Sequence, residues 1–250
     1  MADLKPFRPV TDKVLKPRDA ASLLLVDRNG PMPRLLMGKR HKSLAFMPGM
    51  YVFPGGRADA IDGSIAAASE LRQQDMGKLL KGMGSRASRR RARALGLCAI
   101  RETFEETGLR IAGAVSSEAA RLPDHEDWRA FILPDMDQAN LFLPDLSQIR
   151  YFARAVTPPG QVRRFDTRFF LAFRDSLPGE AAQRLVPSGE LEDLDWVPID
   201  QVDRLPMSPI TPVILSEARA LLLDSRGDLP EEVPVTHISV RNMRFIRKVI

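Results

Sequence analysis

The segment AIRETFEETGL at residues 99–109 constrains this chain most strongly, because it predicts a helix with two chemically different faces. One face is apolar at helical spacing, which predicts that the helix packs on a sheet. Its members are Leu97, Ile100 and Phe104. Gly108 predicts the end of the helix, since glycine readily adopts the left-handed conformation that closes helices. We therefore expect a helix over about 92–107.

Three glutamates occupy another face of the same helix, three and four positions apart. They are Glu102, Glu105 and Glu106. Like charges at this spacing repel by about 0.2–0.5 kcal/mol per pair, and negative charge is unfavourable at a helix C-terminus. Local stability therefore does not explain the cluster. A Mg²⁺ or Mn²⁺ ion would turn the repulsion into coordination, because both ions prefer carboxylate oxygens and water. The alternative is a solvated, charged helix face without a ligand.

The remainder of the chain shows strands interspersed with helices, which predicts an α/β or α+β domain. Strands are expected at 22–27, 34–40, 51–53, 163–173 and 194–200, and helices within 64–93 and over 211–224. The basic, proline-containing residues 1–18 predict an N-terminal arm. We expect one domain over 19–225 and a C-terminal extension over 226–250.

The composition limits the compartment and the partners. A net charge of +5 and a sequence pI of about 9.6 predict anionic partners, either phosphates or nucleic acid. The single cysteine, Cys98, excludes an intrachain disulfide and suits a reducing compartment. The N-terminal MADLKPFRPV has no apolar run, and the longest apolar stretches are too short to cross a bilayer. We expect a cytoplasmic protein without a membrane span.

RETFEETGL at 101–109 resembles the second half of the Nudix box. The matching positions are Arg101, Glu102, Glu105, Glu106, Gly108 and Leu109. Thr103 stands where the family usually has an aliphatic residue. Upstream, FPGGR at 53–57 resembles the strand and double glycine that open the box, with Gly56 as its first glycine. The resemblance implies a Nudix-type αβα sandwich with a mixed central sheet.

The spacing within the box departs from the family. Arg101 follows Gly56 by 45 positions, whereas the family usually has about 14, so about 31 residues are inserted, which loops tolerate at modest entropic cost. We expect a helical insertion inside the box over about 62–92. The family's early glutamate has two candidate positions, Asp62 counted from the glycine and Arg93 counted from the arginine. The sequence does not assign this role.

The long insertion, together with FPGGRADAID and RRFDTRFF, resembles a subgroup of Nudix proteins that includes the peroxisomal coenzyme A diphosphatases. Members that cleave coenzyme A carry an additional motif before the glycines. This chain has Arg40 and Gly49 in compatible places and Ala45 where a second arginine would stand. Arg40 is therefore a predicted substrate-binding residue, and Gly55 and Gly56 are expected to shape the loop beside the substrate.

Three further features have a functional and a structural interpretation. Alternation places Arg164 and Arg168 on one strand face, where one of them clamps a diphosphate or both pair internally. Glu190 precedes a strand and is either a further metal ligand or base, or a turn-exposed side chain. An arginine cluster in the insertion either meets a phosphate or RNA backbone, or is solvated. It comprises Arg86, Arg89, Arg90, Arg91 and Arg93.

The resemblance implies a Mg²⁺- or Mn²⁺-dependent hydrolase that cleaves the diphosphate linkage of a nucleoside diphosphate derivative, with coenzyme A or acyl-coenzyme A-like compounds as candidates. The three glutamates would hold the metal, Arg101 would orient them, and Glu102 or Glu190 would take the proton of the attacking water. The rivals are a non-catalytic nucleotide- or RNA-binding module and an RNA-decapping hydrolase. A homodimer through the apolar and basic C-terminal residues 242–250 is a further prediction.

Overall fold

The computed structural model contains a mixed β-sheet with helices on its flanks. The strands of this sheet are formed largely by the apolar segments of the sequence. The structure describes residues 9–11, 15–44, 47–116, 122–133, 141–179, 185–224, 229–241 and 244–250. Ala45 and most of the predicted N-terminal arm lie outside these ranges. The described residues form one sheet of nine strands and a separate pair of strands.

The main sheet has the strand order β11-β10-β7-β8-β1-β2-β3, with β4 pairing to β1 and β9 to β2. Its strands are β1 (Arg18–Asp27), β2 (Arg34–Arg40), β3 (Tyr51–Val52), β4 (Gly55–Arg57), β7 (Arg150–Val156), β8 (Phe165–Phe173), β9 (Leu191–Pro198), β10 (Thr236–Arg241) and β11 (Arg244–Val249). β1 runs parallel to β8 and antiparallel to β2 and β4. This mixed pairing brings β4 beside the first half of β1.

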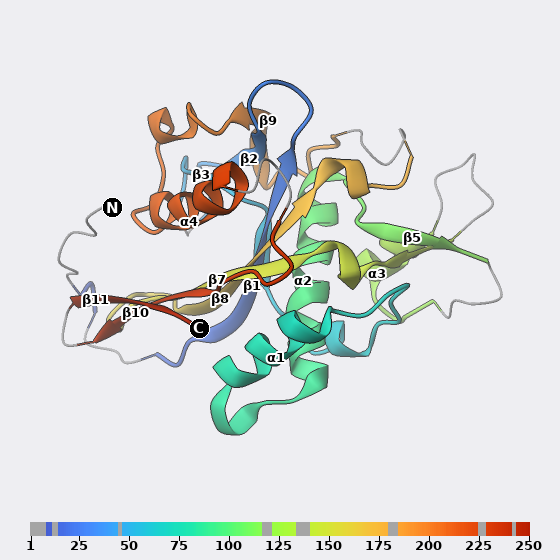
Figure 1. Cartoon of the computed structure of the whole chain (residues 1–250), viewed down its shortest axis with the longest axis horizontal. Coiled ribbons are helices and arrows are strands. Elements are labelled where there is room, and N and C mark those ends of the chain that lie inside the picture. The colour runs from blue at the N-terminus through green and yellow to red at the C-terminus, as the bar shows by residue number, and fades with distance from the viewer. Residues whose placement is uncertain are drawn as a thin grey trace.

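Helices cover both faces of the sheet, as Figure 1 shows. They are α1 (Gln73–Gly82), α2 (Arg89–Thr107), α3 (Glu126–Ile132) and α4 (Thr211–Asp224). Side chains of β1 alternate between the faces: Leu23 packs in a core with Ile100 of α2, and Leu24 packs in a second core with Ile214 of α4. β5 (Ala112–Val115) and β6 (Leu141–Pro144) form the separate ribbon on the α2 side. The αβα sandwich with a mixed sheet is therefore confirmed.

The glutamate-bearing helix has the predicted end and an earlier start. Gly108 has φ 76°, and its N–H donates to the Phe104 carbonyl at 2.7 Å, so the helix closes at Thr107 as expected. The helix begins at Arg89 because the Ser88 side chain accepts the Arg91 N–H and caps it.

The insertion between Gly56 and Arg101 is helical, as predicted, and α1 is fastened to the sheet by a buried ion pair. Asp75 of α1 accepts from Arg150 Nε at 3.1 Å and from the Tyr151 N–H at 3.2 Å. Arg150 also donates to the carbonyls of Pro230 and Glu231. One arginine thus joins the insertion, strand β7 and the segment that leads to β10.

The C-terminal residues extend the sheet. β10 runs parallel to β7, β11 pairs antiparallel with β10, and Ile250 exchanges backbone hydrogen bonds with Val235. In the described part of the chain, no helix is long and apolar enough to cross a membrane.

Replacing Asp75 should destabilise the fold strongly. Asp75→Ala leaves the Arg150 guanidinium, of which 6% is exposed, without its carboxylate, and breaking a buried pair in this way costs about 3–5 kcal/mol. Glu70→Ala is the matched control, since Glu70 pairs with Arg93 at the surface with 53% of its side chain exposed, and such pairs contribute about 0–1 kcal/mol. Urea denaturation of both variants measures the difference, and equal losses would contradict the anchoring role of Asp75.

Candidate active site

The double glycine of β4 lies directly against the glutamates of α2. The Gly55 N–H donates to Glu106 Oε2 at 2.9 Å. A Cβ atom added at Gly56 would lie 2.4 Å from the Glu102 carboxyl group, so the Glu102 side chain would have to leave its present position. One at Gly55 would lie 2.6 Å from the Ala21 carbonyl oxygen. Glycine is therefore needed at both positions because strand and helix approach so closely.

Arg101 organises the carboxylates from a buried position. Its side chain is 3% exposed, and Nη1 lies 2.8 Å from Glu105 and 3.0 Å from Glu102. Nη2 donates to the Arg57 carbonyl at 3.1 Å and thereby holds the end of β4. The predicted bracing of a carboxylate by Arg101 is present, and it involves two glutamates and the loop.

Asp62 occupies the position that the sequence left unassigned. It is fully buried, accepts from Arg101 Nε at 3.0 Å and from the Trp128 indole N–H at 2.9 Å, and accepts the Asp59 N–H. Arg93, the other candidate position, pairs with Glu70 instead. The count from Gly56 therefore leads to the residue that contacts Arg101, and the inserted residues follow Asp62.

Thr103 and Cys98 of α2 are buried beside the glutamates, and both donate hydrogen bonds to backbone carbonyls. Thr103, which replaces the usual aliphatic residue, is fully buried, and its hydroxyl donates to the Ala99 carbonyl at 2.7 Å, so that no polar atom is left unpaired. Cys98 is also fully buried, and its thiol donates to the Gly56 carbonyl at 3.6 Å. Burial and the charge of Glu102 raise the pKa of the Cys98 thiol.

The side chains of the three glutamates are largely shielded from solvent. Glu106 is 4% exposed because the β4 loop covers it. Burial and the charges of Glu102 and Glu190 raise the pKa of Glu106 to about 8. Burial and the charge of Glu105 raise the pKa of Glu102 to about 7, against the opposing effect of Arg101. The solvated face that formed the alternative interpretation is thus absent at Glu106.

Arg40 and Glu190 lie near the same carboxylate. The charge of Arg40 lowers the pKa of Glu106 and that of Glu190 raises it. The two residues reach this place through strand pairing, since Arg40 is in register with Leu191 at the start of β9, and His41 donates its N–H to the Glu190 carbonyl at 3.0 Å. The structure therefore gathers these predicted residues with Gly55 and the glutamates.

The donor set suits a divalent cation, although the ligands are not preassembled. Among the residues that the structure describes, no group of three His, Cys, Asp or Glu side chains is arranged to hold a metal ion. Glu105 is turned toward Arg101 and Glu106 toward Gly55. Glu102 and Glu106 nevertheless lie together as two desolvated carboxylates with raised pKa values. A hard divalent cation prefers such oxygen donors and would neutralise their negative charge.

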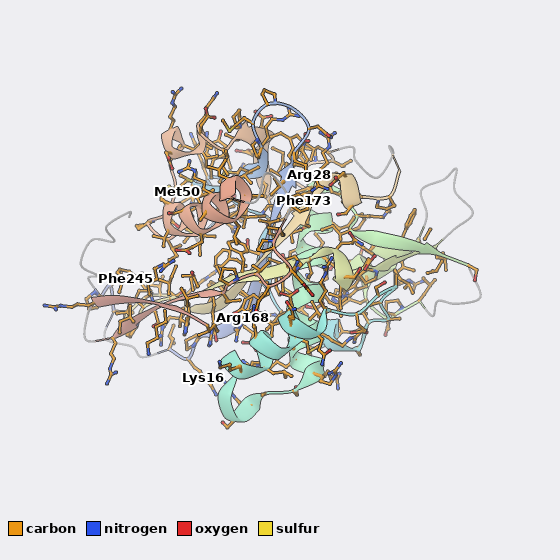
Figure 2. The ribbon with its side chains drawn as sticks, viewed as in Figure 1. Lys16, Arg28, Met50, Arg168, Phe173 and Phe245 are labelled. Atoms are coloured by element: carbon orange, nitrogen blue, oxygen red, sulfur yellow. The ribbon has the colours of Figure 1, made fainter. Side chains whose placement is uncertain are left out.

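The two arginines of the alternating segment lie elsewhere. Arg168 is 1% exposed and pairs with Asp19 at 3.1 Å and Asp166 at 3.0 Å, so the internal pairing holds and it cannot contact a bound substrate. Figure 2 shows Arg168 in the interior of the molecule. Arg164 donates to the carbonyls of Thr157 and Leu15 and lines a cavity beside β1.

A helix with three glutamates, packed on a double glycine within a three-layer sandwich, is the arrangement that the Nudix resemblance implied. The chain belongs to the Nudix hydrolase family. The family described as the NUDT19 Nudix domain has a model that matches residues 18–205, which include the whole of this site.

Individual relatives support the same membership. Acyl-coenzyme A diphosphatase NUDT19 of Gallus gallus is 27% identical, over 66% of this chain and 57% of that protein. Putative nudix hydrolase 7 of Caenorhabditis elegans is 28% identical, over 72% of this chain and 51% of that protein. The chain thus spans little more than half the length of these curated relatives. A solved Nudix hydrolase from Alicyclobacillus acidocaldarius has a TM-score of 0.56 and 27% identity, over 80% of this chain and 90% of that one.

The buried carboxylates predict how the stability of the metal-free protein depends on pH. The pKa of Glu106 is about 8 in the folded protein and near 4.5 when unfolded, so between these values the folded state retains a proton that the unfolded state releases. Stability then falls as pH rises through this window. Glu106→Gln removes this dependence and should raise the stability at about pH 8 by a few kcal/mol.

Denaturation in the presence of a chelator, at about pH 5 and about pH 8, measures this effect. Glu70→Gln serves as the control, because 53% of the Glu70 side chain is exposed at the surface. A Glu106→Gln variant that loses stability at the higher pH as steeply as the parent protein would contradict the desolvation of Glu106.

Proposed function

We propose that the protein is a Mg²⁺- or Mn²⁺-dependent pyrophosphohydrolase that cleaves the diphosphate linkage of a nucleoside diphosphate derivative, with coenzyme A and its acyl derivatives as the substrate class. The contact of Glu106 and Glu102 with the Gly55–Gly56 backbone carries the proposal. Membership of the Nudix family and the similarity to an acyl-coenzyme A diphosphatase support it.

Different residues of the chain hold the cation, orient its ligands and accept the proton of the attacking water. Glu102, Glu105 and Glu106 supply the oxygens that hold the cation, and Arg101 fixes two of them. Gly55 and Gly56 let the backbone of β4 approach α2 closely. Arg40 lies where it can meet a phosphate beside Glu106.

Either Glu102 or Glu190 takes the proton of the attacking water in this proposal, since both lie near Glu106. When bound, the divalent cation polarises a phosphoryl oxygen, lowers the pKa of a bound water and neutralises charge on the leaving oxygen. Arg101 stays charged throughout, because its hydrogen bond to Asp62 and the surrounding carboxylates raise its pKa despite burial.

Two rivals predict different outcomes. A module that binds nucleotide or RNA without hydrolysis has no need of three clustered glutamates, two of them held by a buried arginine. An RNA-decapping hydrolase would bind RNA with a steep salt dependence. The compartment, which we predict to be the cytoplasm, and the homodimer remain predictions for localisation and sedimentation experiments.

Neutralising Glu105 should abolish turnover and leave the fold intact. Glu105→Gln keeps the shape of the side chain but removes the charge that the cation requires, and we expect a loss of at least about 100-fold, in line with the loss of one strong electrostatic contact in the transition state. A substrate panel of coenzyme A, acyl derivatives, ADP-ribose, dinucleotides, nucleoside triphosphates and capped RNA, assayed with each metal, gives the rates. Near-parental turnover by Glu105→Gln, compared with Glu70→Gln as control, would remove the central assignment.

Adding a methyl group at Gly56 should lower the turnover rate by displacing Glu102. Gly56→Ala would place its Cβ atom 2.4 Å from the Glu102 carboxyl group, whose flexible side chain must move away. We expect turnover to fall at least about tenfold, because small displacements of catalytic groups have large effects on rate. Gly77→Ala in α1 is the control, since no atom lies within 4 Å of its added Cβ. Full activity of Gly56→Ala would show that the position of Glu102 is not critical.

A further inference from the structure

The cavity that Arg164 lines, of about 1120 Å³, opens where β1 and β8 begin, next to β4. Four segments form its walls: the approach to β1 with its first residues, the end of β4 at Arg57 and Ala58, the insertion before and within α2, and the turn before β8. Its charged lining residues are Lys16, Arg18, Asp19, Arg57, Arg86, Arg91, Arg163 and Arg164. Seven of these eight side chains are cationic, so we name it the cationic cavity.

Asp19, the one carboxylate among these described lining residues, is already paired with arginines. Asp19 accepts both Nε and Nη2 of Arg91, at 2.6 and 2.7 Å, and also contacts the buried Arg168 at 3.1 Å. Although burial raises the pKa of Asp19, these two arginines lower it below its usual value. Asp19 therefore remains charged and paired, and it does not offset the other cations.

Most of the remaining cations have no side-chain partner in the part of the chain that the structure describes. Four of them make no ion pair and no side-chain hydrogen bond with another described residue: Lys16, Arg18, Arg86 and Arg163. Arg57 contacts Asp59 at 3.3 Å, and Arg164 is bonded to backbone carbonyls. A concave surface with this excess of positive charge attracts and concentrates polyanions.

The cationic cavity begins one residue after the double glycine that contacts the glutamates. Its near wall is Arg57, the residue after Gly56, whose carbonyl accepts from Arg101. Its far wall includes Arg91, eleven residues before Glu102 on the same helix, which corresponds to about 16 Å of helix axis. A ligand of nucleotide size can therefore extend from β4 into the cavity.

We propose that the cationic cavity binds a phosphate monoester that the substrate carries at a distance from the diphosphate to be cleaved. The inference rests on the proposed function, because it assigns a second contact of the same substrate. Guanidinium groups pair with phosphate oxygens in bidentate fashion, and lysine adds a point charge. The class of substrate is a nucleoside 5′-diphosphate derivative with a further phosphate on its ribose.

The experiment compares ligands that differ only in that remote phosphate. Coenzyme A and 3′-dephospho-coenzyme A are compared as substrates. Adenosine 3′,5′-bisphosphate and adenosine 5′-monophosphate are compared by calorimetry with the metal-free protein. The test variant Arg86→Ala/Arg163→Ala removes two cavity cations. The control Arg89→Ala/Arg244→Ala removes two exposed arginines outside the cavity lining, so that the net charge changes equally.

We expect the parent protein to bind the bisphosphate about tenfold or more tightly than the monophosphate, in line with hydrogen bonds to a charged group. The test variant should lose most of this preference, and its KM for coenzyme A should rise about tenfold at nearly unchanged kcat. The control variant should keep both. Absence of a preference in the parent protein, or an equal loss in both variants, overturns the proposal.

Two further outcomes separate the inference from its premise. If no diphosphate is cleaved, the proposed function fails, while calorimetry with the bisphosphate still decides whether the cationic cavity binds the remote phosphate. If an RNA oligonucleotide displaces the bisphosphate and binds more tightly, with a steep salt dependence, the cavity is a nucleic-acid-binding site and the proposal is overturned.

Discussion

The buried guanidinium of Arg101 is the contact on which the rest of the site depends. It holds Glu102 and Glu105 on its own helix, Asp62 from the start of the insertion, and the Arg57 carbonyl at the end of β4. A charge in this position is tolerated only because carboxylates and a carbonyl surround it. The fork of Arg101 therefore fixes the distance between helix and strand, and the approach of Gly56 to Glu102 follows from that distance. Lysine, with one compact ammonium group, cannot satisfy these directions together.

Local pattern was sufficient to predict the elements that carry the site. The spacing of Leu97 and Ile100 gave the buried face of α2, and Gly108 gave its end, because both signals act within one or two turns. The αβα architecture came from the Nudix resemblance and is confirmed by the two cores on either side of β1.

The features that sequence could not supply all depend on contacts between distant segments. Glu106 is buried by Gly55, 51 positions away, and Arg168 is paired with Asp19, 149 positions away. Alternation placed Arg168 on a face but could not identify its partner. Asp62 could have been chosen over Arg93 by counting from the glycine alone, because the insertion then falls after the counted residues. No pattern in the sequence brings the four segments that line the cationic cavity together.

The single thiol of Cys98 has a practical consequence. Its sulfur is enclosed between α2 and the Gly56 carbonyl, and its ionisation is suppressed, so an alkylating reagent reaches it only when strand and helix part. The rate of labelling in native buffer thus reports how often β4 and α2 separate around Cys98. Since the chain has no other cysteine, the measurement needs no engineered probe. A bound cation or ligand that holds β4 against α2 would slow the labelling of Cys98.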